Sequence, residues 1–335
     1  MCHRKSGRVL LISVFSGCRF PQNHPVAGLI HAFFLKEVSV MTIQTISVIG
    51  LGEMGTPIAG FLLKAGYDVK GFDTREERIN ALLPLGLKSA GSPKDAAAAV
   101  DMILLSLPNW EIVQEVVGGK DGILDAAHSG QIIIDCSTVP PAKTKEMAEK
   151  LAENGIHWMD VPISGASSQA REGNMVFMAG GEKKVFDQVK PVLDEVGKKT
   201  VYVGTHGDAA MLKLIVNVVL FLNQAAAVEG LTLGLKAGLD PAVLYDALIS
   251  GAAQSDLIKT RGQDMLAGKF APRGALWIGV KDLGLALEAA KTLRVECPVT
   301  DLYQQMLLKA QRRGWGDQDA TVVMRLYEEL AGIKP

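Results

Sequence analysis

The chain has 335 residues, of which 48% are apolar, and its 35 basic and 36 acidic residues leave a formal net charge of -1. This length allows about two domains with sizeable cores. The balanced charge gives no electrostatic case for binding nucleic acid or a membrane surface. We therefore expect a cytoplasmic globular protein whose partner is a small molecule.

The spacing of cysteine and histidine favours neither a disulfide framework nor a metal site. The cysteines are Cys2, Cys18, Cys136 and Cys297, without a CxxC pair, and the histidines show no HxxxH spacing. We expect a reducing compartment and no bound metal. No histidine stands in motif context with Cys136, so packing is a better interpretation of that residue than a nucleophile.

Residues 1–40 differ in composition from the rest of the chain, and we expect this extension not to be part of the fold. They contain several basic residues against one acid, Glu37, and a short apolar run from Val9 to Phe15. A lipoprotein signal and a transit peptide are both compatible with this composition. We favour a third interpretation, in which translation begins at Met41, because a strand and a nucleotide motif come directly after it.

From residue 45 onwards, short apolar runs alternate with helical patterns. The runs are "TISVIG", "DVKGFD", "MILLSLP", "QIIIDCS", "WMDVPIS", "MVFMAGG" and "TVYVG". This alternation predicts a parallel sheet with helices on both faces. After Gly207 the strand signals stop, and the rest of the chain shows only helical patterns. We therefore expect an α/β Rossmann-type domain at 41–205 and an all-α domain at 206–335, joined by a long helix.

The string "AAMLKLIVNVVLFLNQAAA" at 209–227 predicts a buried core helix. Its longest apolar run is interrupted by Asn217 and followed by Asn223 and Gln224, whereas a membrane span needs about 20 predominantly apolar residues. A helical domain this apolar is also expected to bury surface against a second copy, in a homodimer or a homotetramer.

A glycine-rich turn follows the first predicted strand. In "ISVIGLGEMGTPIAG" the glycines stand in GxGxxG register, and Asp73 follows at the end of the second predicted strand. Strand, turn, helix, strand and acid in this order are typical of a dinucleotide site, where the glycines admit a pyrophosphate to a helix N-terminus. The predicted cofactor contacts here are Gly50, Leu51, Gly52, Glu53, Met54 and Gly55. The alternative is an ordinary tight turn between strand and helix.

Asp73 favours NAD over NADP. Its carboxylate would accept hydrogen bonds from the ribose hydroxyls and would repel a 2′-phosphate. Arg75 would partly offset that charge, so NADP stays a second candidate cofactor. The alternative role for Arg75 is a solvated residue at the start of a helix.

A series of strings in order is similar to the β-hydroxyacid dehydrogenase family, which includes 3-hydroxyisobutyrate dehydrogenase and tartronate semialdehyde reductase. They are "GLGEMG" at 50–55, "SLPNWEIV" at 106–113, "DCSTVPP" at 135–141, "DVPISGA" at 160–166, "GTHGDAAMLKLIVN" at 204–217 and "KDLGLAL" at 281–287. The resemblance implies an NAD(P)-dependent dehydrogenase of a small β-hydroxy acid or a reductase of the matching semialdehyde, such as tartronate or succinic semialdehyde.

The resemblance also assigns cofactor contacts to loops. Leu107, Pro108 and Thr138 match residues that hold the nicotinamide in the family, with strand-end packing and a helix N-cap for Thr138 as alternatives. Lys281 matches a lysine that closes over nicotinamide and substrate from the helical domain. Its alternative role is a solvated partner of a helix acid. Asp282 is expected to tie the helix.

The substrate carboxylate is assigned in the same way. Ser164, Gly165 and Ala166 match the family's carboxylate-binding loop, which usually has two glycines where this chain has Gly165 and Ala166. The methyl group of Ala166 would narrow the site. Ser137 is a further candidate donor to the carboxylate, with a local turn role as the alternative. Trp277 is either core or pocket wall.

Lys213 is the predicted proton donor and Asn217 its partner. Hydride transfer to a carbonyl needs a proton delivered to the oxygen from a group within hydrogen-bond reach. Burial lowers the pKa of a lysine and lets it exchange protons near neutrality. Asn217, one turn later, lies on the same helix face and would orient the ammonium or bind a substrate oxygen. The alternative for Lys213 is a buried stem whose head reaches water.

Other functions remain as alternatives. The scaffold would also suit a reductase of another carbonyl or of an imine, and a non-catalytic dinucleotide-binding protein. The Tyr-x-x-x-Lys arrangement of short-chain dehydrogenases is excluded, because no tyrosine is followed by lysine four residues later.

Overall fold

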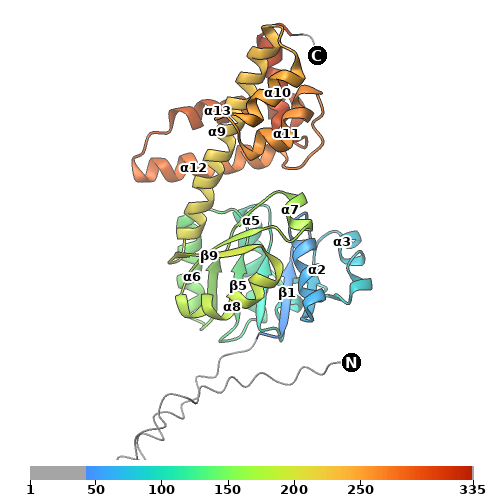
Figure 1. Ribbon diagram of the computed structural model, residues 1–335. Coiled ribbons are helices and arrows are strands. Elements are labelled where there is room, and N and C mark those ends of the chain that lie inside the picture. The colour runs from blue at the N-terminus through green and yellow to red at the C-terminus, as the bar shows by residue number, and fades with distance from the viewer. Residues whose placement is uncertain (1–42, 334–335) are drawn as a thin grey trace, which may run out of the picture. The chain divides into compact units, whose positions relative to one another are not determined.

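The computed structural model describes residues 43–333 (Figure 1), and the prediction about residues 1–40 lies outside this range. The strands are β1 (Thr45–Ile49), β2 (Asp68–Phe72), β3 (Lys88–Ser89), β4 (Met102–Leu105), β5 (Ile132–Asp135), β6 (His157–Asp160), β7 (Ile163–Ser164), β8 (Val176–Gly180) and β9 (Lys199–Gly204). Within the described residues they form one sheet in the order β3-β2-β1-β4-β5-β6-β8-β7, with β9 paired to β8.

Strand β4 shows why the centre of the sheet is apolar at every position. Met102 and Leu104 pack into one core, whereas Ile103 and Leu105 pack into a second core. Parallel strands that are covered on both faces need apolar residues on both. Helices α2 (Gly55–Ala65) and α8 (Lys183–Val196) cover the first core; α4 (Pro93–Ala97), α5 (Trp110–Gly118) and α6 (Pro141–Ala152) cover the second. The predicted sheet with helices on both faces is confirmed.

One edge of the sheet differs from the prediction. Strand β8 pairs antiparallel with β6 and β7, while β8 and β9 are parallel to each other. The chain turns back between β7 and β8 through the short helix α7 (Ser167–Arg171). A short connection suits an antiparallel pair, whereas a parallel pair needs a longer crossover. The prediction of a parallel sheet is therefore wrong for this edge.

After β9 the described chain is helical, apart from one isolated bridge between Ala275 and Asp319. The helices are α9 (Asp208–Lys236), α10 (Pro241–Ser250), α11 (Asp256–Leu266), α12 (Leu276–Leu293), α13 (Pro298–Ala310) and α14 (Met324–Leu330), with short helical turns at Gln311–Trp315 and Ala320–Val323. Their buried residues form a third core. Helix α9 contacts β8, β9 and α6 at its start and α10 to α14 beyond, so it joins the two parts as predicted.

Helix α9 is apolar on its exposed side as well as its buried side. By length and composition it meets the criterion for a membrane span, which core helices of soluble proteins also meet, and 33% of its most apolar window is buried. Ile215 and Val219 are 53% and 56% exposed, and Leu233 is 73% exposed. The prediction of a core helix therefore holds for the buried face of α9, whereas Ile215, Val219 and Leu233 lie on exposed positions.

Candidate active site

The predicted glycine turn joins β1 to α2. Gly50 has a φ of 91°, and a Cβ on it would lie 2.3 Å from the carbonyl oxygen of Ser106. A Cβ on Gly55 would lie 1.8 Å from the carbonyl oxygen of Gly50. Met54, at the N-cap of α2, makes no side-chain cap hydrogen bond. Glycine is therefore required at both positions of the turn, and no side chain caps the helix start at which a pyrophosphate is predicted to bind.

Asp73 is tied to this turn and is paired with an arginine. Its Oδ2 accepts a hydrogen bond from Leu51 N at 2.7 Å, and its Oδ1 accepts one from Arg75 N at 2.9 Å. The guanidinium of Arg78 lies 3.1 Å from Oδ2. Arg75 was expected to offset the negative charge of Asp73, but it bonds Asp73 through its backbone N–H. The guanidinium that offsets this charge belongs to Arg78. Arg78 lies in the first turn of α3 (Glu76–Asn80). Helical side chains point back toward the helix start, and this helix starts just after β2, so the guanidinium of Arg78 reaches Asp73.

The loops after β4 and β5 are tied to each other at the predicted nicotinamide end. Leu107 N donates to Ser137 Oγ at 3.0 Å, and Ser137 N donates to Asp135 Oδ1 at 2.9 Å. Ser137 is only 5% exposed, so its hydroxyl already holds the two loops together. Pro108 is exposed and Thr138 half-buried. The cofactor roles of Leu107, Pro108 and Thr138 and the substrate role of Ser137 stay predictions.

Two buried titratable groups lie where β5 ends and the loop after it begins. Burial raises the pKa of Asp135 to about 6, and the charge of Asp160 on the neighbouring strand adds to that shift, while hydrogen bonds from Ser137 oppose it. Burial also raises the pKa of the Cys136 thiol well above its ordinary value. A thiol that resists ionisation is a poor nucleophile, which agrees with the packing role expected for Cys136.

The predicted carboxylate-binding loop follows β7. Ser164 is half-buried at the end of that strand, and Gly165 has a φ of 144°. The N–H of Ala166 donates to Gln169 Oε1 at 2.8 Å. A substrate carboxylate that used this N–H would therefore replace the Gln169 oxygen. The assignment of Ser164, Gly165 and Ala166 stays a prediction.

A buried carboxylate joins the predicted catalytic residues of α9 to those of α12. Asp282 is 2% exposed, and its Oδ2 accepts a hydrogen bond from Asn217 Nδ2 at 2.6 Å. Its Oδ1 lies 3.0 Å from Lys281 Nζ. The same ammonium donates to the carbonyl oxygen of Thr138, in the loop after β5, at 2.9 Å. Asp282 was expected to tie the helix, and its bond to Asn217 does tie α12 to α9. Because it also lies beside Lys281, it is a further candidate residue of the site.

Lys213, one turn before Asn217 on α9, is near enough to Asp282 and Lys281 for their charges to act on its pKa. Burial lowers the pKa of its ammonium, the charge of Lys281 lowers it further, and the charge of Asp282 opposes both. The residue as a whole is intermediate in exposure. Trp277, one turn before Lys281 in α12, is partly buried and lies outside the third core.

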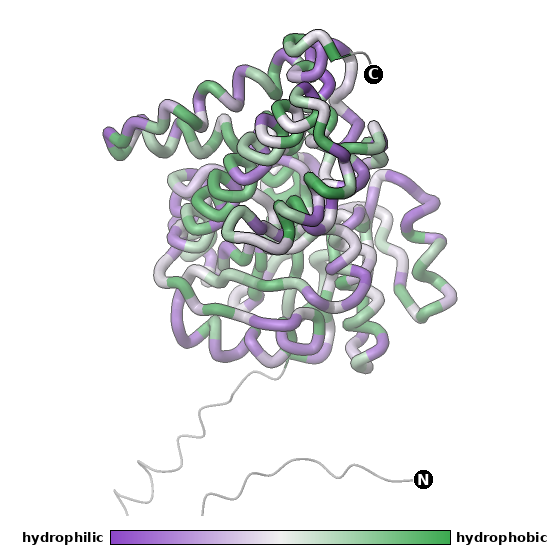
Figure 2. The backbone as a smooth tube through the Cα atoms, turned by 45° about the horizontal axis from the view of Figure 1, so that its top comes forward, coloured by the Kyte–Doolittle hydropathy of each residue, from purple (hydrophilic) through white to green (hydrophobic). Residues whose placement is uncertain are grey.

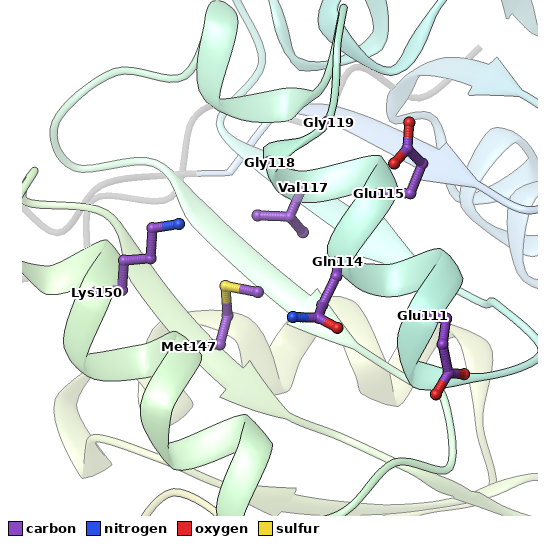
Figure 3. A pocket seen from close by; sticks show the side chains of 8 residues that line it. All are labelled: Glu111, Gln114, Glu115, Val117, Gly118, Gly119, Met147 and Lys150. Atoms are coloured by element: carbon purple, nitrogen blue, oxygen red, sulfur yellow. The ribbon is translucent and has the colours of Figure 1, made fainter.

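Two cavities lie away from these residues. One of about 430 Å³ opens between α5 and α6 (Figure 3), and none of the predicted site residues lines it. The other, of about 490 Å³, borders the glycine turn. Its walls include Leu51, Gly52 and Glu53 together with Arg78 and Arg171. The second cavity therefore adjoins the predicted dinucleotide site.

Known families match both parts of the chain. Residues 45–204 match the model described as the NAD binding domain of 6-phosphogluconate dehydrogenase. Residues 207–327 match the model described as the NAD-binding domain of NADP-dependent 3-hydroxyisobutyrate dehydrogenase. The fold and the glycine turn therefore define an NAD(P)-dependent oxidoreductase.

Curated relatives and solved structures narrow this class. The chain is 36% identical to 2-(hydroxymethyl)glutarate dehydrogenase of Eubacterium barkeri, over 86% of this chain and 96% of that protein. It is 34% identical to 2-hydroxy-3-oxopropionate reductase of Escherichia coli, over 85% and 98%. The crystal structure of 3-hydroxyisobutyrate dehydrogenase from Salmonella typhimurium superposes with a TM-score of 0.78 at 31% identity, over 84% and 99%. The chain belongs to the β-hydroxyacid dehydrogenase family.

Proposed function

We propose that the protein interconverts a small β-hydroxy acid and the matching semialdehyde, with Lys213 as the proton donor in reduction and the proton acceptor in oxidation. The observation that carries this proposal is the cluster of Lys213, Asn217, Asp282 and Lys281. In this cluster burial lowers the pKa of Lys213, Asn217 donates a hydrogen bond to Asp282, and Lys281 lies beside Asp282. Lys281 also donates a hydrogen bond to the carbonyl oxygen of Thr138 in the loop after β5. Relatives named for 2-(hydroxymethyl)glutarate, 2-hydroxy-3-oxopropionate and 3-hydroxyisobutyrate support the substrate class.

The chemistry divides between the dinucleotide and the chain. The bound dinucleotide supplies the hydride in reduction and accepts it in oxidation. Lys213 donates its proton to the carbonyl oxygen as negative charge develops there. A lysine whose pKa is lowered gives up that proton more readily than an ordinary lysine. Asn217 holds one amide proton on Asp282, which leaves its carbonyl oxygen to accept from the ammonium or from a substrate hydroxyl.

The substrate carboxylate is proposed to lie at the loop after β7. Ser164 would donate its hydroxyl, and the N–H groups of Gly165 and Ala166 would complete the site. The N–H of Ala166 would exchange its bond to Gln169 Oε1 for a bond to the carboxylate, so Gln169 would have to turn away. Lys281, already directed at Thr138, would lie close to the cofactor and the substrate.

For the cofactor we propose NAD, with NADP accepted less well. The buried carboxylate of Asp73 would accept from ribose hydroxyls and would lie unfavourably close to a 2′-phosphate. Arg78 at 3.1 Å compensates part of that charge. The preference is therefore expected to be moderate and to depend on Arg78.

The change from strands to helices after β9 and the exposed apolar side chains of the helical part suggest a domain boundary and an assembly. We propose a dinucleotide-binding domain at 41–205, a helical domain at 206–335 and a homodimer or homotetramer in the cytoplasm. The ends of α12 and α13 project on the left of Figures 1 and 2 and carry green apolar positions among purple ones. Leu293, Val299 and Leu302 there are 60%, 60% and 62% exposed. Apolar side chains on a projecting pair of helices are covered most simply by a second copy.

A substrate panel tests the activity. Purified protein is incubated with 3-hydroxyisobutyrate, 2-(hydroxymethyl)glutarate, L-threonate, glycerate and 4-hydroxybutyrate, each with NAD and with NADP, and the absorbance of the reduced cofactor is followed. At least one hydroxy acid should be oxidised, faster with NAD. Absence of turnover across the panel, while the dinucleotide still binds, would favour a non-catalytic scaffold.

A further inference from the structure

Asp160, the last residue of β6, connects two parts of the site that are distant in sequence. Its carboxylate is 1% exposed. Oδ1 accepts a hydrogen bond from Gly207 N at 3.0 Å, and Oδ2 accepts one from Ala210 N at 2.9 Å. Both donors belong to the start of α9, and Lys213 lies one turn beyond Ala210. Ser164, the first of the predicted carboxylate-binding residues, follows Asp160 by four positions.

The carboxylate of Asp160 caps the start of α9, where the N-cap residue makes no side-chain cap of its own. Gly207, the N-cap residue, has a φ of 85° and no side chain to offer. The side chain of Asp208 turns back to Thr205 N at 2.8 Å. Two N–H groups at this helix start, those of Gly207 and Ala210, are therefore satisfied by a carboxylate of the sheet. A negative charge there also suits the positive end of the helix dipole. Burial raises the pKa of Asp160, and the bonds from Gly207 and Ala210 oppose that shift.

The surroundings leave little freedom at this contact. A Cβ on Gly180 of β8 would lie 2.9 Å from both carboxylate oxygens of Asp160, so the carboxylate lies close against that strand. His206 Nε2 lies 2.9 Å from the carbonyl oxygen of Trp158, also in β6. The turn before α9 is thus attached to β6 at two points. Asp160 extends its side chain from β6 to the turn, and His206 extends its side chain from the turn to β6.

We propose that Asp160 is a positioning residue, which fixes the start of α9 against β6 and thereby sets Lys213 relative to the loop of Ser164. The proposal rests on the proposed role of Lys213. A shift of about 1 Å between a catalytic group and its substrate can cost about 100-fold in rate. The glycine turn and Asp73 follow β1 and β2, so dinucleotide binding is not expected to depend on this contact.

Kinetics of a graded series test the proposal. Asp160→Ala loses both bonds, and we expect kcat to fall about 30-fold with the dissociation constant of NADH unchanged. Asp160→Asn keeps one oxygen acceptor, so its kcat should lie between wild type and Asp160→Ala. The asparagine variant also provides the comparison if the alanine variant does not fold.

Asp101 provides the matched control. It precedes β4 at the opposite end of the sheet, and its Oδ2 accepts from Gln44 N and from Thr45 N, both at 2.9 Å. Asp101→Ala and Asp101→Asn should lower the melting temperature by about as much as the Asp160 variants, a few degrees, and leave kcat unchanged. If the Asp160 variants reduce kcat no more than the Asp101 variants, Asp160 has only a structural role and the proposal is overturned.

A measurement without turnover separates this proposal from the proposed function. The rate at which acetic anhydride acetylates Lys213 near neutral pH is read by peptide mass spectrometry, with exposed Lys143 as an internal reference. Asp160 variants should change that rate at least threefold, and Asp101 variants should not. A changed rate supports the positioning role even if Lys213→Ala retains turnover and the catalytic assignment fails. An unchanged rate contradicts the positioning role even if the catalytic assignment holds.

Discussion

The two ends of the candidate site are built in different ways. At the dinucleotide end, consecutive residues from Gly50 to Gly55 form the turn, and two of the glycines have no space for a side chain. At the proton-transfer end, Asn217, Asp282 and Lys281 come from two helices, and Thr138 comes from a loop of the sheet. The first end is a local backbone conformation, whereas the second exists only when the tertiary structure has formed. Substitutions should therefore affect the two ends separately.

Lys213→Ala should have the largest effect and should leave the dinucleotide end intact. Loss of a general acid typically costs about 100-fold to 10,000-fold, so kcat for the best substrate of the panel should fall within that range. The dissociation constant of NADH, measured by fluorescence, should not change. Exposed Lys143→Ala serves as the control and should keep full activity. Retained turnover in Lys213→Ala would defeat the assignment of the proton donor.

Gly55→Ala should break the dinucleotide end. The added Cβ would lie 1.8 Å from the carbonyl oxygen of Gly50, so the turn must move, and we expect NADH affinity to fall about 100-fold, or about 3 kcal/mol. Gly60→Ala in the same helix meets no atom within 4 Å and should bind normally, with stability raised by about 1 kcal/mol from better helix propensity. Equal NADH binding by the two variants would contradict the role of the turn.

Asp282→Asn should change the pH dependence of kcat, because it removes a charge that acts on Lys213. The charge of Asp282 raises the pKa of Lys213 against the effect of burial, so its removal should lower that pKa further. Reduction needs the protonated lysine. The alkaline limb of the kcat profile for reduction should therefore move to lower pH in the variant, and kcat at its optimum should fall about 10-fold because Asn217 and Lys281 lose their shared partner. A limb that stays in place or moves upward would show that Asp282 does not act on Lys213.

Arg78→Ala should have the smallest effect, on the choice of cofactor. Without the guanidinium, the charge of Asp73 is uncompensated, and the ratio of kcat/KM for NAD to that for NADP should rise about 10-fold, or about 1.4 kcal/mol. Arg75→Ala keeps the backbone N–H that bonds Asp73 and should change the ratio less. A larger change in Arg75→Ala would show that Arg75, and not Arg78, compensates the charge of Asp73.

Some parts of this protein follow from the sequence alone. The glycine turn, the alternation of strands and helices and the long joining helix are local patterns, in which spacing along the chain specifies the backbone. The helix period also places Lys213 and Asn217 on one face, whatever packs against it. Their roles stay predictions, but the features that drew attention to them are all local to one segment of the chain.

Other parts were decided by the tertiary structure. The antiparallel edge of β8, the pairing of Arg78 with Asp73, the link from Asn217 through Asp282 to Lys281 and the contact of Asp160 with α9 all join residues from separate elements. Such contacts depend on which elements become neighbours, and a buried carboxylate has the same letter in the sequence as a solvated one. Burial and a partner on another element give Asp282 and Asp160 their significance, and only the folded chain supplies both.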